Sequence, residues 1–148
     1  MFALTTGMGI KTGGIHNILN MDESYCFDFN GVDEYVITTL TGNELMATGE
    51  FTIAAWVRFD DGVPSGGTEH ICGVEHGAYD KIELWVTTGG DPKFQIMSDV
   101  GDNTTAVWQT PLDNGDTGWI FIAAKLQIDA GGSNAYISVN GGYWHQGI

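Results

Sequence analysis

The chain has 148 residues, of which 43% are hydrophobic and 11% aromatic, and its formal net charge is −14. This length allows one domain to bury a core without disulfides or metals, and the hydrophobic content argues against intrinsic disorder. Five Lys and Arg residues stand against 19 Asp and Glu residues. The resulting field repels nucleic-acid phosphates and anionic membranes, so we expect neither as a partner.

The first 22 residues are rich in Gly and Thr and have weak hydrophobic periodicity. We expect residues 1–22 to form an irregular N-terminal arm and residues 23–148 to form one domain. The N-terminus lacks the basic start and apolar run of a signal peptide, and no apolar stretch approaches the roughly 20 residues of a membrane span. The sequence therefore predicts a chain made in a cytoplasm, without a signal peptide and without membrane insertion.

The domain begins with a predicted strand at residues 25–29. Asn30-Gly31 is a tight-turn signal, and residues 34–39 are predicted to return as the second strand of a hairpin. Residues 41–47 suit a single helical turn before the next strand.

Residues 50–60 predict a long strand, because apolar side chains alternate strictly with a second set. The apolar face carries Phe51, Ile53, Ala55, Val57 and Phe59. A helix would scatter these positions around its circumference. The second face is mixed, because Ala54 and Trp56 stand among polar residues. Such a strand suits the middle of a sheet in a two-layer sandwich.

Further strands are predicted after this one, separated by turn signals. They are residues 70–75, 81–87, 93–98, 104–109, 119–128 and 134–139. With no convincing helix beyond the single turn, the pattern predicts an all-β fold, a two-sheet antiparallel β-sandwich. The core residues expected from alternation are Phe51, Ile53, Val57, Ile82, Leu84, Phe94, Ile120, Ile122 and Ile137.

Three ordered stretches carry a family resemblance. Residues 25–36 are similar to an opening hairpin of the form F-D-G-x-D-D-Y-V, and residues 50–60 to a strand of the form F-T-I-S-A-W-V. Residues 118–124 and 135–141 are similar to an ending of the form G-x-W-H-H-V-A-V … Y-V-N-G. In this order the motifs resemble the laminin-G-like branch of the concanavalin A-like lectin/glucanase superfamily.

The resemblance implies a jelly roll of two antiparallel sheets, one of them concave, with Trp56 and Trp119 in the core. One departure concerns the end of the domain. Family members usually continue past the V-N-G turn for several strands, whereas only residues 142–148 follow it here. A sheet edge near residues 25–29 is therefore expected to lack its usual cover, and open edges pair readily with other chains.

Glycosidases of the superfamily carry their acids on one strand as Glu-x-Asp-x-(x)-Glu. The nearest match is residues 78–83, in which Ala78 stands where the nucleophile belongs. Asp80 and Glu83 also fall on opposite faces of a regular strand, whereas retaining chemistry needs two carboxyl groups about 5 to 5.5 Å apart. We therefore expect no catalytic residues and no enzyme.

Trp85 and Glu83 share the outward face of their predicted strand and are candidate ligand-binding residues. Tyr79 and Trp108 are candidates to join them, because an aromatic ring with a polar neighbour suits a sugar. The alternative is that these aromatic side chains cover a neighbouring loop or subunit, as exposed aromatics at protein interfaces do.

Zinc is not favoured by the sequence. His70 and Cys72 share a face of a regular strand, but His76 begins a turn and no fourth ligand is evident, whereas a structural site needs four. Cys26 and Cys72 are the only cysteines, and we expect two free thiols, although neighbouring strands would allow a bridge.

Calcium is the one cofactor that the sequence leaves open. The candidates lie in predicted loops that are rich in oxygen ligands, and they are Asp60, Asp61, Asp99 and Asp102, with Asp113 and Asp116 in a further loop. The resemblance implies calcium at a sandwich rim. The alternative is that loop aspartates form turns and solvate the surface.

The two ends of the chain carry candidate interface residues: Tyr143, Trp144, Phe2 and Leu4. We interpret the chain as a non-enzymatic structural or adhesion module of a virion, such as a phage tail fibre, receptor-binding part or capsid decoration. Its expected partners are other virion or self subunits and a cell-surface glycan. The alternative is a carbohydrate-binding module of a cell-surface or secreted protein, and a degenerate glycosidase comes third. This step is an analogy from fold to function.

Overall fold

The computed structural model describes ten segments of the chain. They are residues 11–13, 18–21, 24–29, 34–39, 41, 44–45, 49–76, 80–97, 103–129 and 132–147. The chain divides into two compact units, Met1–Leu40 and Thr41–Ile148. Each unit is described by itself.

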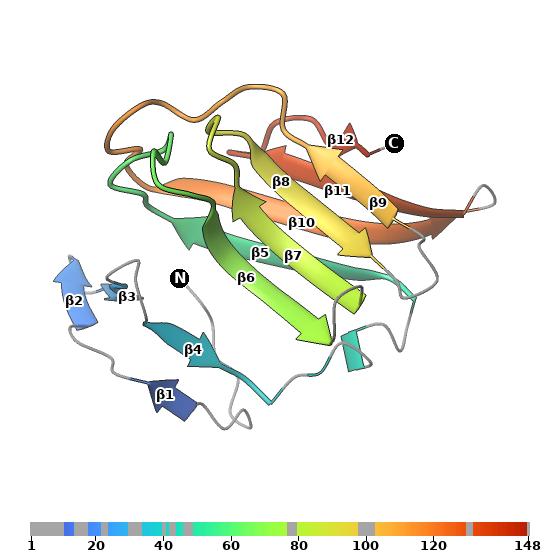
Figure 1. Cartoon of the computed structure of the whole chain (residues 1–148), viewed down its shortest axis with the longest axis horizontal. Coiled ribbons are helices and arrows are strands. Elements are labelled where there is room, and N and C mark those ends of the chain that lie inside the picture. Colours follow the sequence, from blue (N-terminus) through green and yellow to red (C-terminus); the bar gives the residue numbers. More distant parts are fainter. Residues whose placement is uncertain are drawn as a thin grey trace. The chain divides into compact units, whose positions relative to one another are not determined.

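The described residues of the first unit form four short strands (Figure 1). They are β1 (Lys11–Gly13), β2 (Ile18–Met21), β3 (Ser24–Phe27) and β4 (Tyr35–Ile37). β1 pairs with β4 and β2 pairs with β3, both antiparallel. The hairpin expected between residues 25–29 and 34–39 is therefore wrong, because each of these strands pairs with a more N-terminal partner. The arm expected to be irregular carries β1 and β2, and β2 pairs with β3 across the expected boundary at residue 22.

The second unit begins with the expected helical turn, in which Glu44 and Leu45 are helical. Its start is a capping box. The Thr41 backbone N–H donates to Glu44 Oε2 at 2.8 Å, and the Glu44 backbone N–H donates to Thr41 Oγ1 at 3.3 Å. The hydrogen bond from the Thr41 backbone lowers the pKa of the Glu44 carboxyl. The predicted helical turn is therefore confirmed at the described residues 44–45.

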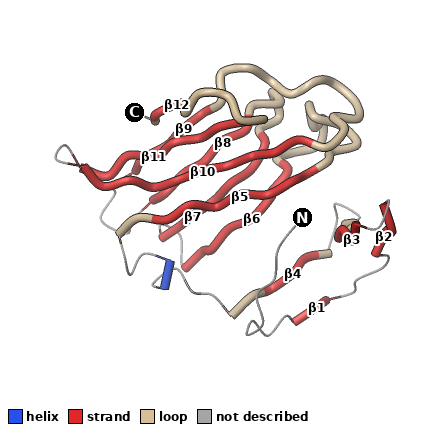
Figure 2. Tube along the Cα trace, turned by 180° about the vertical axis from the view of Figure 1, so that it is seen from behind, coloured by secondary structure: helices blue, strands red, loops and turns tan. Residues whose placement is uncertain are grey.

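Eight strands follow the helical turn. They are β5 (Phe51–Val57), β6 (Glu69–His76), β7 (Asp80–Val86), β8 (Pro92–Met97), β9 (Asn103–Val107), β10 (Ile120–Asp129), β11 (Gly132–Val139) and β12 (His145–Gln146). They form two four-stranded antiparallel sheets, which we call sheet I (β12-β11-β10-β5) and sheet II (β6-β7-β8-β9) (Figures 1 and 2). The expected all-β, two-sheet sandwich is confirmed, and among the described strands of the second unit only β12 was not predicted.

The core lies between the two sheets. Its buried members are Ile82, Leu84, Phe94, Ala106, Ile120, Ile122, Ala124, Ala135, Ile137 and Val139. Leu84 and Phe94 come from sheet II and Ile122 and Ile137 from sheet I, so the inner faces interdigitate as two-layer packing requires. The alternation of the sequence therefore assigned these inward residues correctly.

Strand β5 differs from the expectation in its neighbours. Among the described strands it is an edge strand of sheet I and pairs only with β10, whereas residues 50–60 were expected in the middle of a sheet. Phe51, Ile53 and Val57 point to the core but are only partly buried. Alternation reports which face of a strand is covered and carries no information about how many strands flank it. The side chains of these three residues face the core as predicted, but they are less buried than the prediction of a core position implies.

Trp56 and Trp119 are not in the core, contrary to the family resemblance. Their side chains are 49% and 38% exposed. Trp56 pairs across strands with Phe121, on the face of sheet I opposite to Ile122 and Ala124. Alternation had placed Trp56 on the second face of its strand, and that placement is the one observed.

Among the described residues no helix is long and apolar enough to cross a membrane.

Candidate ligand-binding site

The outer face of sheet I carries a transverse row of polar and aromatic side chains. Across four strands the register aligns Thr52 of β5, Lys125 of β10, Tyr136 of β11 and Gln146 of β12. Side chains directly opposite one another in such a row lie about 4.5–5.5 Å apart at Cβ. The row therefore brings a lysine beside an aromatic ring by backbone pairing alone.

Two aromatic rings hold the Lys125 ammonium group. Its Nζ lies 4.7 Å from the ring centroid of Tyr136 and 4.9 Å from that of Trp144. It also donates a hydrogen bond to Gln127 Oε1 at 3.0 Å. A cation within about 6 Å of an aromatic centroid is attracted by the ring quadrupole. These contacts fix the position of the long, otherwise mobile side chain.

A tight turn brings Trp144 to this position. Asn140 and Gly141 both have positive φ angles, of 50° and 72°, and the Gly142 backbone N–H donates to the Val139 carbonyl at 2.9 Å. This is the geometry of a type I′ turn, for which Asn-Gly is the preferred pair. The buried Ser138 hydroxyl donates to the Gly142 carbonyl at 2.8 Å and secures the far side of the turn.

A cavity of about 290 Å³, largely open to solvent, adjoins Lys125. It is lined by Glu50, Phe51, Thr52, Lys125, Leu126 and Gln127. Four of these six residues are polar, and pockets that bind drug-sized molecules have about 300–1,000 Å³, so the cavity suits a single ring-sized group. We call it the Lys125 cavity. Glu50 Oε1 accepts a hydrogen bond from the Ile128 backbone N–H at 3.0 Å, which ties the start of β5 to the end of β10.

A second aromatic group lies on the same face. Trp56 and Phe121 pack with ring centroids 5.4 Å apart. Between them and the caged lysine the register places a row of small residues, Ala54, Ala123 and Ser138. Four residues separate Phe121 from Lys125 along β10, which corresponds to about 13 Å. The outer face of sheet I therefore carries aromatic side chains at both ends and small side chains between them.

Sheet II places the sequence-predicted candidates differently. Trp85 is only 8% exposed. Its ring is stacked with His70 at a centroid distance of 6.2 Å, and Lys93 Nζ lies 5.1 Å from its centroid. Because β6 and β8 flank β7, these neighbours approach the ring from opposite sides. The indole is thus covered by its own sheet, contrary to the exposed platform that alternation suggested.

Of the other three candidates, Glu83 lies on the same face as Trp85 and Trp108 does not. Trp108 packs against the core and against His145, with ring centroids 4.4 Å apart. Tyr79 lies outside the described residues, as do Phe2 and Leu4 of the expected interface. The structure therefore brings Trp85 and Glu83 together and separates both from Trp108.

The expected common face of His70 and Cys72 is wrong because β6 contains a bulge. The register shifts between these residues, so that His70 pairs with Trp85 and Cys72 pairs with Leu84. One extra residue in a strand moves everything beyond it to the other face. Cys72 has a free thiol, and burial raises its pKa to about 11. The side chain of Cys26 is not among those described.

The loops expected to offer calcium ligands are held by protein donors where they are described. Asp61 Oδ1 accepts hydrogen bonds from the backbone N–H groups of Val63 at 3.0 Å and Gly115 at 3.2 Å. This is the turn-forming role that was the alternative for this residue. No group of three or more His, Cys, Asp or Glu side chains suited to a metal occurs in the described part of the chain. Asp99 and Asp102 lie outside that part, and calcium there stays a prediction.

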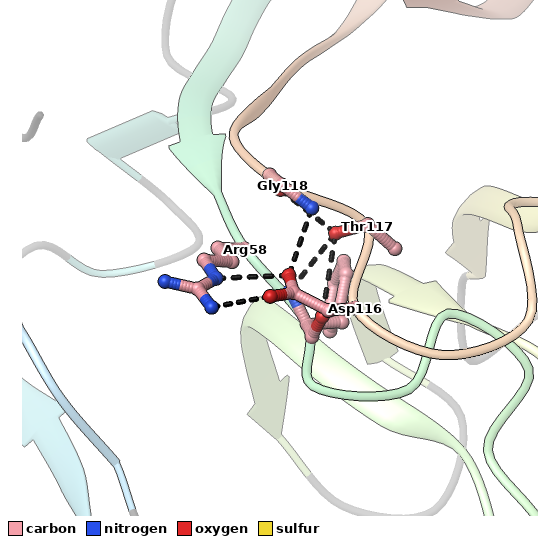
Figure 3. A network of polar contacts seen from close by, with 5 residues as sticks. Arg58, Asp116, Thr117 and Gly118 are labelled. Atoms are coloured by element: carbon pink, nitrogen blue, oxygen red, sulfur yellow. Dashed lines mark hydrogen bonds and ion pairs between the residues drawn. The ribbon is translucent and has the colours of Figure 1, made fainter.

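An ion pair joins Arg58, which follows β5, to Asp116 in the loop before β10 (Figure 3). The guanidinium of Arg58 contacts both carboxylate oxygens of Asp116, with Nε to Oδ1 at 2.9 Å. The Gly118 backbone N–H also donates to Asp116 Oδ1 at 2.9 Å, and Thr117 pairs with Phe59 through its backbone N–H at 3.0 Å. The hydrogen bond from Arg58 lowers the pKa of the Asp116 carboxyl. The side chain of Asp60 is exposed.

Sequence reasoning missed Lys125, Tyr136 and Gln127. One signal was available, since Lys125 is the single cationic residue in the long predicted strand of residues 119–128. Its aromatic neighbours come from β11 and from the turn beyond it. Only the strand pairing brings them to the lysine.

Comparison with known families gives one match. Residues 30–146 match a laminin G family model with the description "Concanavalin A-like lectin/glucanases superfamily". The matched range includes β4 and all eight strands of the second unit. Neither the comparison with curated proteins nor that with solved structures gives a match.

Proposed function

Because the chain belongs to the concanavalin A-like lectin/glucanases superfamily, we propose that it is a non-enzymatic carbohydrate-binding module whose ligand lies on the outer face of sheet I. Laminin-G-like domains are carbohydrate-binding or adhesion modules and are generally non-enzymatic. The observation that carries the proposal is the Lys125 cavity, one of whose lining residues, Lys125, also contacts the half-exposed ring of Trp144.

The chemistry of a sugar matches this arrangement. A pyranose ring has apolar C–H faces, which stack on an aromatic side chain, and a rim of hydroxyl groups, which need hydrogen-bond partners. Trp144 supplies the aromatic surface, with 43% of its side chain exposed. Thr52 and Gln127 line the cavity with a hydroxyl and an amide. Similar polar and aromatic groups converge in small-molecule sites generally.

The surroundings of Glu83 support the non-enzymatic part of the proposal. Its cross-strand neighbours are Gly73 on β6 and Gln95 on β8, and its nearest same-face neighbours on β7 are Lys81 and Trp85. Retaining hydrolysis needs a second carboxyl group about 5 to 5.5 Å away. None of these four direct neighbours supplies one; the diagonal position on β6 holds Glu75, which pairs with Lys81 and whose side chain is not among those described.

Two matched tryptophan substitutions test the binding site. We expect Trp144→Ala to weaken binding to an immobilised glycan panel that includes laminarin, agarose and carrageenan. Trp119→Ala is the control, because Trp119 is 38% exposed and six residues from Lys125 along the chain, about 20 Å in a strand. Equal losses in both variants, or no binding by the parent protein, would contradict the proposed site.

Hydrolysis is tested separately. Incubation with laminarin, agarose and carrageenan is expected to release no reducing ends. Turnover that disappears in Glu83→Gln would overturn the non-enzymatic assignment.

A second candidate function is that of a structural subunit in an assembled particle, such as a virion. It is favoured by Tyr143, whose side chain is 93% exposed. Apolar surface left in water is unfavourable by about 25 cal/mol per Å², so a partner subunit that covers it is stabilised. Native mass spectrometry tests this proposal. We expect an oligomer that is lost on deletion of residues 2–20, and a monomer at working concentration contradicts it.

A further inference from the structure

We propose that Lys125 is an anion-recognition residue, and that the glycan bound at the Lys125 cavity carries an acidic substituent, a carboxylate or a sulfate. This inference rests on the proposed carbohydrate-binding function and names the class of sugar. In the bound state the acidic group accepts hydrogen bonds from the Lys125 ammonium, and the sugar ring stacks on Trp144.

The first argument concerns the partners of Lys125. The chain has 19 carboxylate side chains and only five Lys and Arg residues, so a cation has many opportunities for ion pairing. Arg58 takes one of them and pairs with Asp116. Lys125, in contrast, forms no ion pair with any carboxylate of the described residues, although Glu50 lines the same cavity. Aromatic rings hold its ammonium instead.

The second argument concerns hydrogen-bond donors. A lysine ammonium has three N–H donors and no acceptor. Gln127 Oε1 accepts one of them at 3.0 Å. The ring faces of Tyr136 and Trp144 attract the positive charge, but they do not offer the lone pairs with which a carbonyl or carboxylate oxygen accepts a hydrogen bond. The ammonium therefore retains donor capacity beside the cavity, and a charged acceptor makes the strongest use of it.

The third argument is preorganisation. An exposed lysine loses much rotamer freedom when a ligand immobilises it, and this loss weakens binding. The two ring contacts and the hydrogen bond to Gln127 already restrict Lys125 before a ligand arrives. An anionic group therefore meets a positioned charge, as in sites whose supporting contacts fix the recognising residue.

The net charge of −14 opposes an acidic ligand at long range. The Debye length is about 8 Å at an ionic strength of 0.15 M, so the remaining carboxylates are largely screened at larger distances. A contact with Lys125 at hydrogen-bond distance is screened much less. Glu50 lies in the cavity wall as well, and like charges repel, so the acidic substituent belongs on the side of Lys125 that faces Trp144.

Calorimetry with matched pairs of oligosaccharides tests the proposal. The first pair is an oligogalacturonate and its fully methyl-esterified form, which differ in the carboxylate. The second pair is a carrageenan oligosaccharide and its desulfated form, which differ in the sulfate. We expect the full chain to bind the acidic member of at least one pair about tenfold more tightly than its neutral counterpart. The pair that responds identifies the acidic group.

Lys125→Gln then removes the charge and keeps a similar length. We expect it to lower the affinity for the acidic sugar about tenfold and to leave the affinity for the neutral sugar unchanged. Lys93→Gln is the matched control, because Lys93 also lies over an indole ring, that of Trp85, but on sheet II. Circular dichroism confirms that both variants are folded.

Each outcome decides the question. Equal affinity for acidic and neutral members, or an acidic affinity that Lys125→Gln does not change, overturns the anion assignment and leaves carbohydrate binding intact. A loss in Lys93→Gln as large as that in Lys125→Gln also overturns it, because a general charge effect then suffices. Binding of none of the four oligosaccharides overturns both the anion assignment and the proposed function.

Discussion

The sandwich predicts different stabilities for the same substitution at two positions on the inner face of sheet I. Ile122 is fully buried on β10, with Ala55 of β5 and Val139 of β11 on its two sides. Ile53 points to the same core from β5, the end strand of the sheet, and is partly buried. Replacing each isoleucine by alanine removes the same three carbon groups from unequal surroundings.

The magnitude follows from burial. Three buried carbon groups at about 0.8 kcal/mol each give a transfer contribution of about 2.4 kcal/mol. A cavity contribution adds to this where the neighbours cannot collapse, and measured values for Ile→Ala reach about 2–5 kcal/mol. We expect about 4 kcal/mol for Ile122→Ala, because strands flank β10 on both sides. We expect about 2 kcal/mol for Ile53→Ala, where part of the side chain is already in contact with water.

Urea unfolding followed by circular dichroism measures both values. With a slope of about 2 kcal/mol per M, the midpoint shifts by about 2 M for Ile122→Ala and about 1 M for Ile53→Ala. An unchanged slope shows that the comparison is valid. Equal midpoint shifts, or a larger one for Ile53→Ala, would refute the reasoning, because β5 would then be covered as completely as β10.

Three further predictions concern the loops and the thiol. The folded pKa of Asp116 is lowered by Arg58, so its stabilisation is present above the unfolded pKa and is lost as the pH falls through the folded pKa. Melting curves of the parent and Asp116→Asn should therefore differ at neutral pH and converge in strong acid, and a constant difference contradicts this. Gly90→Ala should lower the free energy of unfolding by about 2 kcal/mol, because φ is +82° and an added Cβ lies 2.9 Å from a methyl group of Val63. The control is Gly66→Ala, which has open space around it and should leave the free energy of unfolding unchanged in the same denaturation assay. Cys72 is partly buried and its pKa is raised to about 11, so it should react with a thiol reagent at pH 8 more slowly in the native protein than in the urea-unfolded chain. Equal labelling rates at this residue in the two states would contradict this.

The candidate site shows how far a local pattern reaches. Alternation correctly placed Trp56 on the second face of its strand, and the V-N-G turn of the family resemblance is a tight turn at Asn140 and Gly141. Neither pattern could show that this turn carries Trp144 to Lys125. That contact needs β10 and β11 to be neighbours in one register, which depends on residues far apart in the chain.

Sheet II shows the complementary case. Trp85 was correctly assigned to the outward face, yet the ring is covered, because His70 and Lys93 stand beside it on the two flanking strands. Cys72 was assigned to the wrong face, since a single bulge in β6 reversed the alternation after His70. A bulge has a weak sequence signal and a large effect, because the side-chain period of a strand is two.

The sequence by itself determined where the strands of the second unit other than β12 lie, which of their faces is apolar except beyond the bulge in β6, and that the fold is an all-β sandwich. These properties depend on a period of two and on turn residues, both of which act over a few positions. Only the tertiary structure decided that β5 ends its sheet, that β3 and β4 do not form a hairpin and that Lys125 lies between two aromatic rings. These properties depend on which strands become neighbours, and that choice is made by the summed packing of both sheets rather than by any one segment.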